Sequence, residues 1–103
     1  MPTKVVPREA EVKRRVYALL RRLGCHIADL SQRRPSHVAP GLPDAYIWPP
    51  FGKPAFWYEA KAPGGKQRPE QRQFQERCER AGVGYVLGGQ RDVEAHLRTI
   101  GVL

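Results

Sequence analysis

The chain has 103 residues, of which 41% are hydrophobic and 27% charged, the composition of one small globular domain. It lacks any apolar run of the roughly 18 residues that favour a membrane-spanning helix, and its N-terminal residues lack the apolar core of a secretory signal. The formal charge of +8 and the pI near 10.1 predict an anionic partner, most simply nucleic acid. The alternative is a basic surface that only aids solubility.

Residues 9–23 predict an amphipathic helix. Its apolar residues recur at the spacing of one helical face: Val12, Val16, Leu19, Leu20 and Leu23. Pro7 lies just before this helix and Gly24 ends it. Residues 25–31 can form a first strand, and the Pro- and Gly-rich residues 32–43 predict a loop.

The rest of the chain alternates between strands and helices. In chain order we predict a hairpin of strands 44–48 and 55–61 around a turn at 49–54, a loop at 62–68, a helix at 69–81, a strand at 83–89 and a helix at 92–103. The order α-β-β-β-α-β-α predicts a single α/β domain over residues 1–103, with a central mixed sheet flanked by helices.

Cysteine and histidine offer no framework for a disulfide or a zinc site. Cys25 and Cys78 lie far apart in apolar segments, which favours buried thiols in a reducing cytoplasm over a disulfide. His26, His37 and His96 are scattered, without the spacing of zinc ligands. We therefore expect a cytoplasmic protein.

The strand at 55–61 begins with aromatic residues and ends with charges. Side chains alternate along a strand, so Glu59 and Lys61 share one face. Asp44 opens the other strand of the hairpin, so it lies near the same end. Carboxylates that lie close together repel, and a hard cation such as Mg²⁺ resolves the conflict. The carbonyl of Ala60 can supply a further oxygen ligand.

A metal ion at this position would lower the pKa of a bound water and steady charge on a phosphate oxygen. Lys61 would then orient or help to deprotonate the attacking water, or neutralise the charge that develops on phosphorus. The simpler interpretation of Glu59 and Lys61 is a surface ion pair that contributes at most about 1 kcal/mol.

Taken together and in order, the segments "PGLPDAYIW" and "FWYEAKAPGGKQRPEQRQFQERCERAGVGYVL" resemble the virus-type replication-repair nuclease (VRR-NUC) domains of the PD-(D/E)XK superfamily. The resemblance runs from about residue 9 to residue 97. It implies a nuclease-like fold and a Mg²⁺- or Mn²⁺-dependent endonuclease that cuts branched DNA, such as flaps or four-way junctions, in repair, replication or recombination. Stand-alone members of this length look like the bacterial and phage proteins of the family, several of which behave as dimers suited to four-way junctions. The resemblance therefore implies a possible homodimer.

The resemblance also assigns roles to individual residues. Asp44 and Glu59 match the metal-binding carboxylates, Lys61 the catalytic lysine, and Gln71 the glutamine of the following helix. Periodicity agrees, because Gln71 falls on one helical face with Phe74, Cys78 and Ala81. The alternative is that Gln71 is an ordinary polar residue at a helix start. Arg68 stands where the family commonly has a serine that caps this helix, so Arg68 can contact phosphate instead.

The family also has a glutamate on its first helix, near the metal. Glu9 and Glu11 are both candidates, and we favour Glu9 because it lies on the core-facing stripe of the helix. The alternative for both is that acidic residues in a first turn stabilise the helix dipole.

Basic residues on both sides of the expected site are candidates for contact with the DNA backbone: Arg33, Arg34, Lys66, Arg68 and Arg72. The arginines of the first helix are more simply a solvated face. The competing hypothesis for the whole chain is a non-catalytic, basic DNA-binding module that keeps the nuclease-like fold.

Overall fold

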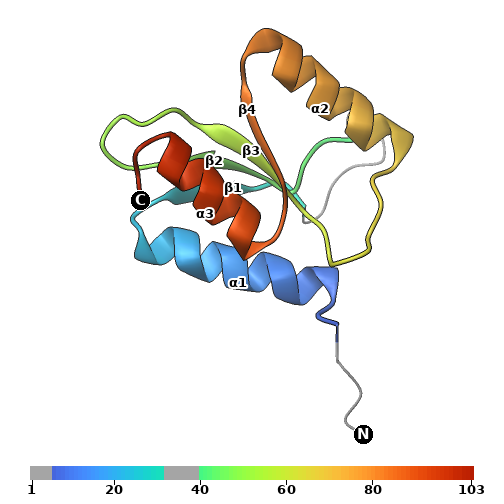
Figure 1. Ribbon diagram of the computed structural model, residues 1–103, viewed down its shortest axis with the longest axis horizontal. Helices are drawn as coiled ribbons and strands as arrows, with labels where there is room; N and C mark the ends of the chain where they lie inside the picture. The colour runs from blue at the N-terminus through green and yellow to red at the C-terminus, as the bar shows by residue number, and fades with distance from the viewer. Residues whose placement is uncertain (1–5, 32–39) are drawn as a thin grey trace, which may run out of the picture.

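The computed structural model describes residues 6–31 and 40–103, which form three helices and four strands (Figure 1). In chain order the elements are α1 (Glu9–Arg22), β1 (His26–Asp29), β2 (Ala45–Trp48), β3 (Phe56–Ala60), α2 (Pro69–Ala81), β4 (Gly84–Gly88) and α3 (Gln90–Thr99). Among the described residues, no helix has the length and apolarity needed to cross a membrane.

The four strands form one mixed sheet in the order β1-β2-β3-β4. The first three strands are antiparallel to one another, and β4 runs parallel to β3. This arrangement confirms the predicted α/β class with a mixed central sheet flanked by helices. The predicted strand at 25–31 is shorter than expected, at four residues.

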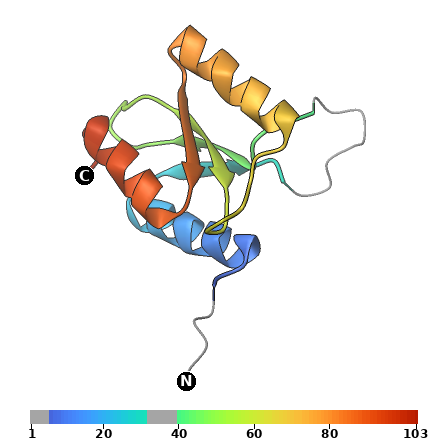
Figure 2. The ribbon, with the colours of Figure 1, turned by 45° about the vertical axis from the view of Figure 1, so that its right-hand side comes forward.

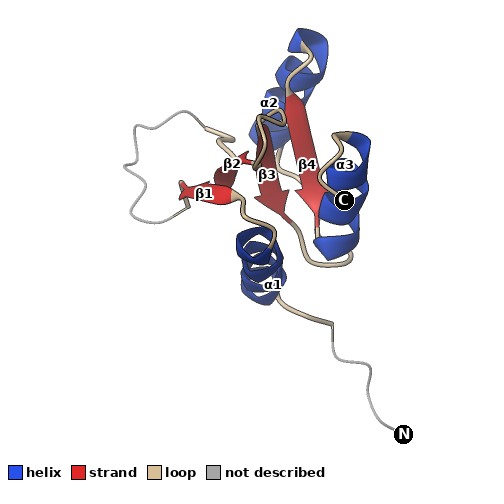
Figure 3. Cartoon of the chain, turned by 90° about the vertical axis from the view of Figure 1, so that its left-hand side faces the viewer, coloured by secondary structure: helices blue, strands red, loops and turns tan. Residues whose placement is uncertain are grey.

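Alternation along β3 separates the two faces of the sheet. Tyr58 packs edge-on against Tyr17 of α1, whereas Trp57 packs against Phe74 of α2. Helices α1 and α3 contact each other and cover one face, and α2 covers the other (Figures 2 and 3). The buried core between the sheet and the helices α1 and α3 includes Val16, Leu20, Ile47, Phe56, Tyr58, Ala60, Val93 and Leu97.

The helix bounds agree closely with the sequence pattern, except at the C-terminus. The predicted helix at 92–103 begins two residues earlier and ends at Thr99. Gly101 adopts a left-handed backbone conformation with φ +86°, which a continuing α-helix does not allow. On α2, Gln71 and Cys78 are buried as expected, but Ala81 is exposed as the last residue of the helix.

The predicted state of the cysteines is confirmed. Cys25 and Cys78 are both buried free thiols. Burial raises the pKa of both thiols, so neither is activated as a nucleophile.

Candidate functional site

Asp44 and Glu59 lie side by side at one end of the β2–β3 hairpin. The antiparallel register pairs Ala45 with Tyr58, so the residue before Ala45 stands beside the residue after Tyr58. The Oδ2 atom of Asp44 accepts a hydrogen bond from the backbone N–H of Ala60, at 2.8 Å. The Asp44 carboxylate is therefore fixed to the strand that carries Glu59 and Lys61.

Glu59 is a carboxylate in the protein interior, with only 4% of the residue exposed. Its Oε2 atom accepts a hydrogen bond of 3.0 Å from the side-chain amide of Gln71, which is itself buried. The oxygen of the same amide accepts the backbone N–H of Arg68, at 2.9 Å. Gln71 thus caps the start of α2 and holds the Glu59 carboxylate, so the missing serine at position 68 is partly replaced.

The loop that carries Asp44 contacts the start of α2 through a glycine. Gly41 has φ +83°, and a Cβ atom at this position would overlap the backbone carbonyl of Glu70 and crowd the backbone nitrogen of Gln71. Only glycine allows both this conformation and this close approach. The "GLPD" segment is therefore packed against the same helical turn that holds Glu59.

Lys61 leaves the end of β3 with its backbone tied to β4. Its N–H donates to the carbonyl of Gly88 at 3.2 Å. Its ammonium forms an ion pair of 3.4 Å with Glu9, and the Lys61 side chain is only 15% exposed, against 53% for Glu9. Glu11, the other candidate on the first helix, instead faces Arg15 of the same helix at 3.9 Å.

Glu9 therefore contacts the site through its ion pair with Lys61. Its side chain is exposed, although its helical spacing predicted a position on the core-facing stripe. Among residues 6–31 and 40–103, no three His, Cys, Asp or Glu side chains form a group that could hold a metal ion. Glu9 thus does not complete a set of three carboxylates with Asp44 and Glu59.

Asp44 and Glu59, which the strand register places beside each other, are donors of the type that a hard divalent cation takes. Mg²⁺ is commonly held by one or two carboxylates, with water and substrate phosphates as its other ligands. Asp44, Glu59 and the carbonyl of Ala60 supply such oxygen atoms. Burial, followed by the charge of Asp44 at Tyr58 and by that of Glu59 at Tyr85, raises the pKa values of these two tyrosines.

A second group of polar side chains, which sequence patterns did not reveal, supports Asp44 from β1. Oδ1 of Asp29 accepts hydrogen bonds from the backbone N–H and hydroxyl of Ser31 and from the hydroxyl of Tyr17. Lys13 of α1 donates to Ser31 at 2.9 Å, and the N–H of Leu30 donates to the carbonyl of Asp44 at 2.7 Å.

This network ties α1 and β1 to the loop of Asp44. Burial alone would raise the pKa of Asp29, but the hydrogen bonds from Ser31, the charge of Lys13 and the hydrogen bond from Tyr17 together lower it. The "DLS" triplet, an acid two residues before a serine, is a common turn pattern, and it is the sequence signal from which this turn could have been predicted.

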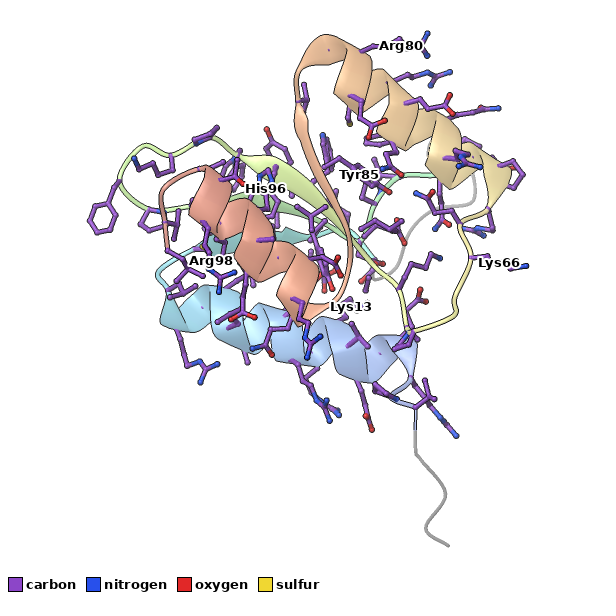
Figure 4. All side chains as sticks on the ribbon, in the orientation of Figure 1. Lys13, Lys66, Arg80, Tyr85, His96 and Arg98 are labelled. Carbon is purple, nitrogen blue, oxygen red and sulfur yellow. The ribbon has the colours of Figure 1, made fainter. Side chains whose placement is uncertain are left out.

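The basic residues after β3 are exposed beside the site. Lys66 and Arg68 lie in the loop between β3 and α2, and Arg72 lies in the first turn of α2. Figure 4 shows Lys66 pointing away from the sheet. Arg33 and Arg34, the other predicted DNA contacts, lie outside the described residues, as does His37.

The chain was compared with protein-family models, curated proteins and solved structures, and none of them gave a significant match.

Proposed function

We propose that the protein is a divalent-metal-dependent endonuclease that hydrolyses phosphodiester bonds in branched DNA, such as flaps or four-way junctions. The observation that carries this proposal is the convergence of Asp44 and Glu59 at one strand end, with Lys61 two residues further along. Asp44 is held by the backbone of Ala60 and Glu59 by Gln71, so both carboxylates are oriented before any substrate binds. The basic composition, with 18 Lys and Arg against 10 Asp and Glu, supports DNA as the substrate.

The roles follow from the chemistry of the residues. Asp44, Glu59 and the Ala60 carbonyl would hold Mg²⁺ or Mn²⁺, which when bound lowers the pKa of water and neutralises phosphate charge. Lys61 would orient the attacking water or stabilise the charge that develops on the phosphate. Gln71 acts as a positioning residue for Glu59. Glu9, which holds the Lys61 ammonium, would set the direction of that group.

Cleavage assays test this proposal with a panel of flaps, forks, duplexes and four-way junctions in Mg²⁺, Mn²⁺ or EDTA. Asp44→Asn is the matched variant, because the amide oxygen can still accept the Ala60 N–H while the charge is lost. We expect metal-dependent cutting of branched DNA by the native protein and none by the variant. Equal cutting by both proteins would remove the site assignment.

The second candidate is a DNA-binding module without catalytic activity. One observation favours it: the ammonium of Lys61 is already paired with the carboxylate of Glu9. In the same panel, a shift of DNA mobility without cutting under every metal condition would support the module. Absence of any salt-sensitive DNA binding would exclude both candidates.

The proposed substrate also bears on the oligomeric state. A four-way junction has two-fold symmetry, which a two-fold homodimer would match. Light scattering during gel filtration, with and without junction DNA, distinguishes a mass of 11.7 kDa from twice that mass.

A further inference from the structure

A hollow of about 440 Å³ lies on the other side of Lys61, between the first half of α1, the loop after β3 and the start of α3. Figure 1 shows how α1, α3 and the loop after β3, which supply its lining, are arranged. The volume is within the range of about 300–1,000 Å³ that small-ligand sites occupy. Asp44, Glu59 and Gln71 do not line the hollow, so it is separate from the carboxylates, and Lys61, two residues after Glu59, lies in its wall.

The walls of the hollow differ in chemistry. Three cationic side chains line it, and they come from three segments: Arg15 from α1, Lys61 after β3, and Arg91 from α3. The apolar part of the wall is formed by Val12, Pro63 and Leu87. Such a combination fits a ligand with an anionic group at one end and a flat, weakly polar ring at the other.

The one carboxylate of α3 in the wall is already engaged. Asp92 accepts the backbone N–H of Gly89 at 3.0 Å. Gly88, with φ +128°, lies directly against this carboxylate, and a Cβ atom there would overlap it. The wall therefore carries three cations against one engaged carboxylate. Arg15 also faces Glu11 at 3.9 Å and Lys61 pairs with Glu9 at 3.4 Å, so a phosphate group in the hollow would compete with these two partly exposed glutamates.

We infer that this hollow binds one nucleotide unit of a DNA strand, with the phosphate on Arg15, Lys61 and Arg91 and the base against Val12, Pro63 and Leu87. The inference rests on the proposed function for its choice of DNA. It adds a specific consequence: a strand that reaches the carboxylates places a neighbouring nucleotide in the hollow, and this requires a strand end or an unpaired segment. Branched DNA supplies both.

Binding is measured in EDTA, so that no cutting occurs, by NMR titration of the whole chain. The probes are inorganic phosphate, dAMP and a single-stranded oligonucleotide of about ten residues. We expect the oligonucleotide and dAMP to shift the amide signals of Lys61 and of residues 87–92. The variant Arg15→Gln/Arg91→Gln should weaken the binding of both probes at least about tenfold. The control Arg80→Gln/Arg98→Gln removes the same charge outside the hollow (Figure 4) and should change it less than about twofold.

Three outcomes would overturn the inference. They are equal weakening by the two double variants, binding of inorganic phosphate as tight as that of dAMP, and binding of dAMP tighter than that of the oligonucleotide. The last would indicate a site for free nucleotides. The proposed function can fail separately. If no metal condition gives cutting, the binding of nucleotides in the hollow still stands. If the protein cuts DNA but the two double variants weaken probe binding equally, only the inference about the hollow is excluded.

Discussion

The two ends of the β2–β3 hairpin differ sharply, although the same two strands form both. At the open end, Asp44 and Glu59 are held by the backbone of Ala60 and by Gln71 of α2. At the closed end, the chain turns between Pro50 and Lys53, with positive φ angles at Phe51 and Gly52. Phe51 is 92% exposed there, in a conformation that disfavours a bulky residue.

The comparison of the two ends shows where the fold holds side chains in one orientation. The open end is held by contacts from separate segments, because the loop at Gly41, the start of α2 and the network around Asp29 all reach it. The closed end is a local turn, and a Cβ atom added at Gly52 would have no neighbour within 4 Å. Catalytic groups need such support to stay oriented, whereas a turn does not. Changes at the open end should therefore affect activity, and changes at the closed end only stability.

After Asp44→Asn, which should abolish cutting, the largest effect is expected for Lys61→Met. The variant keeps the length and apolar stem of the side chain but removes the ammonium that, in the proposed reaction, would stabilise developing charge. Cutting of branched DNA should fall by at least about 100-fold, measured as kcat/KM. Binding to the same DNA in EDTA should change little, and full activity would exclude Lys61 as a catalytic residue.

The next largest effect is expected for Gln71→Leu. It removes the amide that donates to Glu59 and accepts from Arg68, while it keeps the volume of the side chain. We expect a loss of about 10- to 100-fold in cutting and of about 1–3 kcal/mol in the free energy of unfolding. Gln71→Glu separates the two roles, since its carboxylate can still accept the Arg68 N–H but cannot donate to Glu59. If that variant cuts DNA normally, Gln71 only caps the helix.

Gly41→Ala and Gly52→Ala form a matched pair across the hairpin. Both glycines have positive φ angles, +83° and +69°, so each substitution costs about 1 kcal/mol in the backbone alone. Only Gly41 also packs against α2, so its variant should lose about 2–4 kcal/mol in total. Chemical denaturation measures both, and equal losses would contradict the packing of the "GLPD" loop on α2.

The basic residues near the site should matter through the salt dependence of DNA binding. Removing three charges with Lys66→Gln/Arg68→Gln/Arg72→Gln should reduce the slope of log affinity against log salt by about 2–3. The control triple variant Lys53→Gln/Arg80→Gln/Arg98→Gln removes the same charge at other exposed positions. Fluorescence anisotropy with a labelled junction compares them, and an equal reduction in slope would mean that the interaction is with net charge alone.

The smallest effect is expected for Phe51→Asn, and it should be a gain. Asparagine tolerates the left-handed conformation far better than phenylalanine, and little buried surface is lost from a side chain that is 92% exposed. The free energy of unfolding should rise by about 0.5–1 kcal/mol, with no change in cutting. A loss of activity in this variant would show that the exposed ring has a role of its own.

Much of the fold was predictable because local patterns and the tertiary structure agree. The apolar spacing of residues 12–20, Pro69 at a helix start and Gly82 at its end all predicted elements that the structure contains. The pairing of strands could be predicted only for the hairpin, where the turn brings the partners together. The parallel neighbour of β3 depends on how α2 crosses the sheet, which no local pattern specifies.

The candidate site was predictable as a set of residues but not as a set of contacts. The hairpin register placed Asp44 beside Glu59 as predicted. Strand alternation predicted that Glu59 and Lys61 share one face, whereas in the structure Glu59 is held by Gln71 of α2 and Lys61 by Glu9 of α1. The partner of Lys61 is Glu9, some fifty positions away along the chain, and neither its exposure nor this ion pair follows from helical spacing. The support from Asp29 and Ser31 likewise depends on how β1 pairs with β2.

Titration with Mn²⁺, followed by NMR, tests the central claim that Asp44 and Glu59 together bind one divalent ion. Paramagnetic Mn²⁺ broadens the signals of nuclei close to it. At substoichiometric metal, the amide signals of Asp44, Ala60 and Lys61 should broaden first in the native protein and remain sharp in Asp44→Asn. Broadening that is the same in both proteins, or that begins at acidic residues elsewhere on the surface, would contradict the account.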